Sequence, residues 1–174
     1  MKTKLVIFDL DGVLVEAKNI HYDALNQALG DDYAISWKEH LSTYDGLKTF
    51  QKLDMLTERK GLPTELHKQI WESKQKLTLQ MLKKLQPNQN LQQLMSALVD
   101  EGYKISVCSN SIRKTVLTVL SKLGLMEYMD YIISNEDVQN SKPHPEMYWR
   151  AISKMDEVSS FAHLRLIKYN PYTP

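Results

Sequence analysis

The chain opens with an apolar run that ends in two carboxylates. Residues 4–8 have the sequence KLVIF, and β-branched and aromatic residues of this kind are typical of a buried strand. Asp9 and Asp11 follow the run, and Gly12 then frees the backbone to turn. Carboxylates in such a place are costly unless a partner or a metal accompanies them. The pattern therefore predicts a strand whose carboxyl end carries charged groups that need a partner.

Between residues 17 and 86 the pattern is helical instead. This segment is mostly polar, its apolar positions recur at helical spacing, and it contains no convincing strand. Its clearest part, 62–85, opens with Pro63, which suits the first turn of a helix. One face of that helix is expected to carry Leu66, Ile70, Leu77, Met81, Leu82 and Leu85. Pro87 then interrupts the chain.

From about residue 89 onward, predicted helices and strands alternate. Apolar residues at the helical spacing i, i+3, i+4, i+7 and i+8 are Leu91, Leu94, Met95, Leu98 and Val99. A second helix, near 111–123, is expected to turn inward Ile112, Val116, Leu117, Leu120 and Leu123. The predicted strands cover 103–108, 130–134 and 164–169, and a further helix covers 145–155.

This alternation favours an α/β fold with a doubly wound parallel sheet. The helical block at 17–86 is too long for a simple crossover between two strands, so we interpret it as an inserted cap. Its two linkers to the rest of the chain are expected near 14–18 and 86–90.

Composition narrows the class of protein. The 174 residues are 43% hydrophobic and 25% charged, as in an ordinary globular protein, and the net charge of +1 gives no electrostatic case for nucleic acid or an anionic membrane as a partner. The single cysteine, Cys108, excludes an internal disulfide and fits a reducing compartment. Asp9 and Asp11 fall where the apolar part of a signal peptide must be uncharged, so a cytoplasmic protein is expected. A monomer or weak dimer is also expected.

The two aspartates have two interpretations. Carboxylates this close repel one another, and both stay ionised most easily around a cation such as Mg²⁺, which prefers oxygen ligands together with phosphate and water. Alternatively, Asp-Leu-Asp-Gly merely ends a strand and begins a turn. Ligands of open parallel sheets bind beyond the carboxyl ends of the strands, which is where Asp9 and Asp11 are expected to lie.

Two further groups are expected at equivalent strand ends. Ser109 and Asn110 follow the strand at 103–108 and precede a helix, where a hydroxyl and main-chain N–H groups can bind an anion. Lys142 lies between a strand and a helix, before a proline. Taken singly, these are an ordinary helix cap and an ordinary surface lysine. Acids, an anion cradle and a lysine at one edge of a sheet together indicate phosphoryl transfer.

These stretches resemble the motifs of the haloacid dehalogenase (HAD) superfamily of phosphohydrolases and phosphomutases, in particular the branch with a helical cap like β-phosphoglucomutase. The stretch FDLDGVLVE (8–16) is similar to the first motif, CSNS (108–111) to the second and KPHPEMYWRAI (142–152) to the third. The resemblance covers about residues 4–155 and rests on three motifs in the family's order.

The resemblance implies a division of the chain and a set of roles. A HAD-like core would comprise 1–16 and 88–174, shortened at its C-terminal side, and 17–87 would form the helical cap. Asp9 would be the nucleophile that forms an aspartyl-phosphate, and Asp11 the general acid and base. The Asp9 side chain and the Asp11 main-chain carbonyl would bind Mg²⁺. The phosphoryl group of a small phosphorylated substrate would be held by Ser109, the Asn110 main chain and Lys142.

The same resemblance suggests residues of the cap. His21 matches a histidine common in the β-phosphoglucomutase branch, which would lie near the hinge and face the site; a histidine that only packs on the surface is the alternative. Gly46 matches a glycine of the cap's substrate loop, which makes Lys48 and Thr49 candidates for specificity. An ordinary exposed loop is the alternative for these two.

The fourth motif of the family is missing from the sequence. The family has one or two acids at the end of a strand, about two dozen residues after the lysine of the third motif, and they complete the metal shell. Here residues 159–174 are SSFAHLRLIKYNPYTP, without an acid. One explanation is a truncated or frame-shifted reading of a normal gene. The other is a reduced or inactive member that binds a phosphorylated ligand or a protein partner without turnover.

Overall fold

The computed structural model describes residues 3–156 and 162–166. The chain divides into two compact units. The first comprises the residues up to Glu16 and those from Leu85 onward, and the second is Ala17–Lys84. The second unit thus ends at Lys84, whereas the sequence placed the end of the inserted cap at residue 87. No helix in the described residues is both long and apolar enough to cross a membrane.

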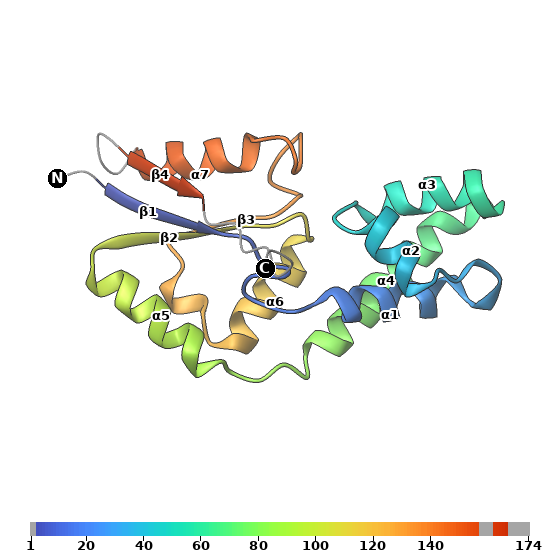
Figure 1. Cartoon of the computed structure of the whole chain (residues 1–174), viewed down its shortest axis with the longest axis horizontal. Helices are drawn as coiled ribbons and strands as arrows, with labels where there is room; N and C mark the ends of the chain where they lie inside the picture. Colours follow the sequence, from blue (N-terminus) through green and yellow to red (C-terminus); the bar gives the residue numbers. More distant parts are fainter. Residues whose placement is uncertain (1–2, 157–161, 167–174) are drawn as a thin grey trace. The chain divides into compact units, whose positions relative to one another are not determined.

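The first unit is built on a parallel sheet (Figure 1). Its strands are β1 (Thr3–Phe8), β2 (Tyr103–Cys108), β3 (Tyr131–Ile133) and β4 (Ala162–Leu166). The order is β3-β2-β1-β4, with Val6 level with Ile105 on one side of β1 and with Arg165 on the other. This arrangement confirms the α/β fold with a parallel sheet. Of the strand expected at 164–169, residues 167–169 lie outside the described residues.

Helices cover both faces of this sheet. They are α5 (Gln89–Asp100), α6 (Arg113–Leu123) and α7 (Glu146–Asp156), with a short 3₁₀ turn, η4 (Met126–Tyr128), before β3. Helix α7 lies over one face, and α5 and α6 lie over the other (Figure 1). The core under α7 consists of Leu5, Ile7, Cys108, Ile133, Met147, Ala151 and Met155. Every second residue of β1 faces this core because side chains alternate along a strand.

The helices of this unit differ in detail from the sequence pattern. In α5 the buried residue is Met95, whereas Leu94 and Val99 are 45% and 46% exposed. In α6 the backbone of Ile112 is still extended, so the helix begins one residue later and its half-buried Leu117 lies beside the inward stripe. That stripe consists of Thr115, Val116, Val119, Leu120 and Leu123.

The second unit contains helices and no strand among its described residues, as the sequence predicted. Its longer helices are α1 (Lys18–Leu29), α3 (Thr49–Lys60) and α4 (His67–Leu82). Short turns join them: η1 (Asp31–Tyr33), α2 (Trp37–Glu39), η2 (His40–Tyr44) and η3 (Thr64–Leu66). One hydrophobic core serves them all, and it consists of Leu25, Leu29, Ile35, Tyr44, Leu53, Leu56, Leu62 and Ile70.

The start of α4 was predicted wrongly and its inward face was predicted only in part, with Ile70 and Leu82 buried as expected. Pro63 precedes the short turn η3, and the α-helix starts at His67. Its buried stripe includes Lys74 and Thr78, while Leu77 and Met81 are only half-buried. The error has a physical reason, because the long aliphatic part of a lysine side chain can line an apolar face. A prediction that counts only apolar residues therefore shifts the inward face of the helix by about one position.

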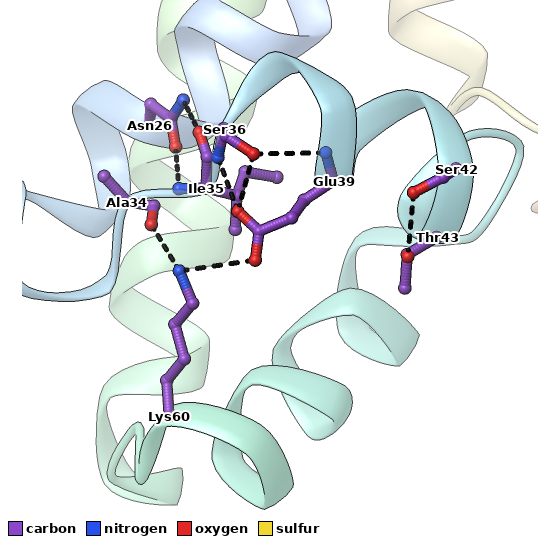
Figure 2. A network of polar contacts seen from close by, with 8 residues as sticks. All are labelled: Asn26, Ala34, Ile35, Ser36, Glu39, Ser42, Thr43 and Lys60. Carbon is purple, nitrogen blue, oxygen red and sulfur yellow. Dashed lines mark hydrogen bonds and ion pairs between the residues drawn. The ribbon is translucent and has the colours of Figure 1, made fainter.

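A polar network fixes the connection between α1 and α3 (Figure 2). The Asn26 amide donates to the Ile35 carbonyl at 2.9 Å and accepts from the Ile35 N–H at 2.8 Å. The Ser36 hydroxyl accepts from the Glu39 N–H, and the Glu39 carboxylate accepts from the Ser36 N–H, which forms a capping box around α2. Lys60 donates to the Ala34 carbonyl at 2.6 Å. These bonds satisfy the polar main-chain groups of a turn whose Ile35 side chain is buried in the core of the unit.

His40 is a buried polar side chain of this unit. The ring is 1% exposed, stacks on Trp37 at 5.3 Å and meets the edge of Tyr22 at 5.4 Å between centroids. Neither ring nitrogen has a hydrogen-bond partner among the described residues. Burial, with the neighbouring charge of Lys52, lowers the pKa of His40 to about 4. The folded unit therefore holds this histidine neutral.

We expect His40 to make the second unit acid-sensitive. Because its pKa is about 4 when folded and 6.5 ordinarily, the unfolded chain binds a proton that the folded chain does not, so stability is lost as pH falls from 6.5 toward 4. His40→Phe keeps the ring contacts and removes the titration. When the pH is lowered from 8 to 5, the unfolding free energy of the variant should fall by about 2 kcal/mol less than that of the wild type. Urea unfolding at both pH values measures this, and equal losses in the two proteins would contradict it.

Candidate active site

A tight turn after β1 brings the two aspartates to the end of the strand. Gly12 has φ +78°, a conformation that favours glycine, and its N–H donates to the Val15 carbonyl at 2.8 Å. The Leu14 N–H donates to the Leu10 carbonyl at 2.9 Å, and the Leu10 side chain is fully buried. The turn is thus held from within and anchored in the core, which fixes Asp11 close to the strand end.

Asp9 and Lys142 form an ion pair at this edge of the sheet. The Lys142 ammonium lies 2.7 Å from Asp9 Oδ1 and donates to the Cys108 carbonyl at 2.9 Å. Asp9 Oδ1 also accepts from the Leu10 N–H at 2.7 Å. Within the described residues, no hydrogen bond to Asp9 Oδ2 is formed. One oxygen of the carboxylate is therefore held in place, and the other is open to a reacting group.

Ser109 follows β2 directly and lies at the same edge. Its N–H donates to the Ile133 carbonyl at 2.9 Å, which extends the pairing of β2 with β3. Its hydroxyl oxygen accepts from the Ser111 N–H at 3.0 Å, which leaves the hydroxyl proton to donate to an anion. The residue has no exposed surface, so a phosphoryl group can reach the hydroxyl only after the groups that cover it move.

The side chain of Asn110 has a role that the sequence did not indicate. Its amide donates to the Lys142 carbonyl and accepts from the Lys142 N–H, both at 3.0 Å. The Asn110 carbonyl accepts from the Asn135 amide at 2.9 Å. The expected role for Asn110 was an anion contact through its main chain, whereas the side chain clamps the segment that carries Lys142. Its position before a helix, rather than its residue type, was the only signal in the sequence.

Two other carboxylates support the loop around Lys142. Hydrogen bonds from the N–H groups of Asn140 and Gln139 lower the pKa of Glu146 to about 2. Although burial opposes it, hydrogen bonds from Ser134 lower the pKa of Asp137. Both carboxylates are occupied by the loops that they hold, so neither supplies a substitute for the missing acids of the fourth motif.

The oxygen groups of Asp9 and Asp11 fit a magnesium ion that is shared with phosphate. Among the described residues, no group of three or more His, Cys, Asp or Glu side chains could hold a metal alone. Mg²⁺ in phosphoryl-transfer sites commonly uses one or two carboxylates and completes its shell with phosphate oxygens and water. The Asp9 carboxylate and the Asp11 carbonyl match such a partial set of hard oxygen donors.

Cys108 is a structural residue. Burial raises the pKa of its thiol to about 12, and the thiol donates to the Met147 carbonyl at 3.6 Å. A thiol with this pKa carries almost no thiolate near neutral pH, so it is a poor nucleophile.

The two cap candidates lie in the second unit. His21, in α1, has its Nδ1 3.4 Å from the Lys74 ammonium, and Lys48 stands just before α3, where its N–H donates to the Gln51 side chain at 3.0 Å. Lys74 and Lys52 were not among the residues expected from the sequence, and both are only 9% exposed. Buried lysines are unusual, and helical spacing could have found Lys74, since it lies four residues after Ile70 on the inward face.

Comparison with known proteins agrees with this architecture. The family model of haloacid dehalogenase-like hydrolases matches residues 6–160. Among curated proteins, a phosphorylated carbohydrates phosphatase of Thermotoga maritima is 23% identical over 88% of this chain and 71% of its own length. The pyrophosphatase PpaX of Bacillus mycoides is 28% identical over 90% of this chain and 71% of its own length.

Solved structures show the same fold. The β-phosphoglucomutase of Clostridium difficile superposes with a TM-score of 0.75 at 24% identity, over 90% of this chain and 72% of that one. CbbY of Rhodobacter sphaeroides, solved with xylulose-(1,5)bisphosphate, gives a TM-score of 0.77 at 18% identity, over 90% of this chain and 73% of that one. The chain belongs to the haloacid dehalogenase-like hydrolases. It is an enzyme of the phosphatase type within that family.

Asn110 offers a test of the clamp on Lys142. Asn110→Ala removes both hydrogen bonds to the Lys142 main chain, and we expect kcat/KM for a phosphate ester to fall about tenfold or more because a small displacement of a charged group is costly. Asn110→Asp keeps an acceptor for the Lys142 N–H and loses the donor, so its loss should be intermediate. Steady-state kinetics measure both. An alanine variant with wild-type kcat/KM would show that the clamp has no functional role.

Proposed function

We propose that this enzyme is a Mg²⁺-dependent phosphohydrolase or phosphomutase that acts on a small phosphorylated metabolite through an aspartyl-phosphate. The observation that carries the proposal is the contact of Lys142 with one oxygen of Asp9, beside Ser109 and Asp11 at one edge of the sheet. A cation on one carboxylate oxygen holds the side chain still, and it leaves the second oxygen to attack. The same lysine can neutralise a phosphoryl group that arrives at that oxygen.

The chemistry follows in two steps. Asp9 Oδ2 attacks phosphorus, the bond between phosphorus and the leaving oxygen breaks, and Asp11 gives that oxygen a proton. Asp11 then takes a proton from water, and the water oxygen displaces Asp9 from phosphorus to give inorganic phosphate. If a hydroxyl of a second substrate replaces water, the outcome is phosphoryl transfer to that hydroxyl. The two outcomes differ in the acceptor and share the same residues.

Binding of the phosphoryl group is assigned to three donors. The Ser109 hydroxyl has its proton available because its oxygen already accepts from Ser111. The Lys142 ammonium has three N–H donors, of which two contact Asp9 and the Cys108 carbonyl. The Asn110 main chain is the third proposed contact. Magnesium, bound by the Asp9 carboxylate and the Asp11 carbonyl, would offset the charge on the phosphoryl oxygens.

The proposed substrate class rests on the relatives and on the cap. The relatives named above include a phosphatase for phosphorylated carbohydrates and a protein solved with a sugar bisphosphate. In the second unit, His21 and Lys48 are the proposed contacts to an anionic or hydroxyl-rich substrate, and the buried Lys74 supports His21 from 3.4 Å away. We also propose a cytoplasmic monomer or weak dimer.

A second candidate function is binding without turnover. It is favoured by one observation: residues 158–174 contain no acid, so the fourth motif that completes the metal shell in the family is missing from this sequence. A protein of this kind would hold a phosphorylated ligand at Lys142 and Ser109 and release it unchanged. The two functions share a binding site and differ only in whether Asp9 is ever phosphorylated.

The first test is an assay with Mg²⁺ against p-nitrophenyl phosphate and a panel of sugar phosphates. Wild-type protein should release inorganic phosphate, and Asp9→Asn should lower kcat by at least about a thousandfold because the nucleophile is lost. EDTA should abolish turnover. Activity that survives Asp9→Asn or EDTA would contradict the assigned roles. No turnover, together with calorimetric binding of phosphate that needs Lys142, would instead favour the binding protein.

The cap proposal is tested with a matched pair of lysines. Lys74 is buried beside His21, whereas Lys76 is exposed on the same helix. Lys74→Met removes the partner of His21, so it should raise KM for sugar phosphates about tenfold and leave KM for p-nitrophenyl phosphate nearly unchanged, since His21 is the proposed contact of the larger substrate. Lys76→Met should match the wild type on both substrates. Equal effects of Lys74→Met on both substrates would show that it acts through folding of the cap rather than through specificity.

A further inference from the structure

We propose that Ser111 is the positioning residue for Asp11, the acid and base of the proposed reaction. The Ser111 hydroxyl donates to Asp11 Oδ2 at 3.1 Å, across a sequence separation of a hundred residues. The inference rests on the proposed function, because it assigns a task to a partner of the proposed acid. It adds a residue that neither the motifs nor the comparisons assign to this step.

Ser111 is itself held rigidly. Its N–H donates to Ser109 Oγ at 3.0 Å, and its carbonyl accepts from the Asn135 N–H at 3.2 Å. The main chain of Ser111 is thus fixed from both sides before its hydroxyl reaches Asp11. A donor fixed in this way can restrict the rotation of the carboxylate, whereas a donor on a loose loop would move with it.

The common alternative role for a serine here is a helix cap, and the structure excludes it. The N-cap of α6 is Ile112, and no side chain caps that helix. The first turn is closed by the Thr115 N–H, which donates to the Ile112 carbonyl at 2.9 Å. The hydroxyl of Ser111 is directed to Asp11 instead.

The bond has a consequence for proton transfer. A hydroxyl donor on Oδ2 is compatible with either protonation state of Asp11, because a protonated carboxyl can carry its proton on Oδ1 and still accept on Oδ2. By holding Oδ2, Ser111 therefore restricts which face of the Asp11 carboxyl group is turned toward the substrate when a proton is transferred. A carboxylate that rotates freely would spend part of its time with the wrong oxygen toward the substrate.

Ser111 also connects the proposed proton donor, Asp11, to the proposed phosphate contact, Ser109. Ser111 contacts Ser109 through its N–H and Asp11 through its hydroxyl. Ser109 is a proposed phosphate contact, so one residue sets the distance between the phosphoryl group and the acid that protonates the leaving oxygen. That distance is what general acid catalysis depends on.

The experiment compares two leaving groups. p-Nitrophenolate leaves without help from an acid, whereas the alkoxide of a sugar phosphate must be protonated as it leaves. Because kcat/KM covers the steps up to the first irreversible one, it reports the phosphorylation of Asp9. Ser111→Ala should lower kcat/KM about thirtyfold for a sugar phosphate and less than about threefold for p-nitrophenyl phosphate.

Two variants serve as controls. Ser111→Thr keeps the hydroxyl and should restore most of kcat/KM for the sugar phosphate. Ser153→Ala, at an exposed serine on α7, should match the wild type on both substrates. Equal losses on the two substrates in Ser111→Ala, or no rescue by threonine, would overturn the proposal and leave the proposed function standing.

Absence of turnover in the wild type would contradict the proposed function by itself. In that case a double-mutant cycle still tests the contact between Ser111 and Asp11. Thermal unfolding midpoints are measured for Ser111→Ala, Asp11→Ala and the double variant. A direct hydrogen bond to a carboxylate predicts that the shifts do not add, because the second substitution removes a bond that is already lost. Additive shifts would overturn the positioning role.

Discussion

The ion pair between Lys142 and Asp9 is the interaction on which the candidate site depends. The Lys142 ammonium joins three segments that are far apart in sequence, since it lies 2.7 Å from Asp9 after β1 and donates to the Cys108 carbonyl at the end of β2. A parallel sheet makes this possible because the carboxyl ends of neighbouring strands meet at one edge. The Asn110 clamp then fixes the main chain of Lys142 to the segment that follows β2. The site is therefore a property of the sheet rather than of any one loop.

The balance of charge explains the unequal exposure of the pair. The lysine side chain is 14% exposed and the aspartate side chain 44% exposed. Covering the cation is tolerable because a carboxylate and a carbonyl both contact it, and each replaces a water molecule. Leaving the anion open costs little and keeps one oxygen accessible. A covered cation beside an open anion suits the capture of a phosphoryl group, because the attacking oxygen needs access and the lysine needs only to be near.

Much of the fold could be predicted from the sequence, and the reasons for the misses are physical. The strand expected at 103–108 is β2, because a short and largely apolar segment between turn-forming residues favours a strand. The inward face of α4 was predicted only in part because Lys74 is buried there. Asp9, Ser109 and Lys142 could be proposed because strand ends converge. The roles of the Asn110 amide and the Ser111 hydroxyl could not, since side-chain direction depends on contacts across more than thirty residues.

A metal site with few acidic ligands implies an order in which the proposed site would assemble. Residues 158–174 carry no acid, so the proposed metal site is built from Asp9 and Asp11 alone, and Lys142 lies 2.7 Å from Asp9 and offsets part of its charge. Mg²⁺ gives up its water reluctantly and needs compensating negative charge to do so. A phosphoryl group supplies that charge, and it can bind first through Lys142 and Ser109. Metal affinity should then depend strongly on bound phosphate, and the lysine, rather than the metal, would recruit the substrate.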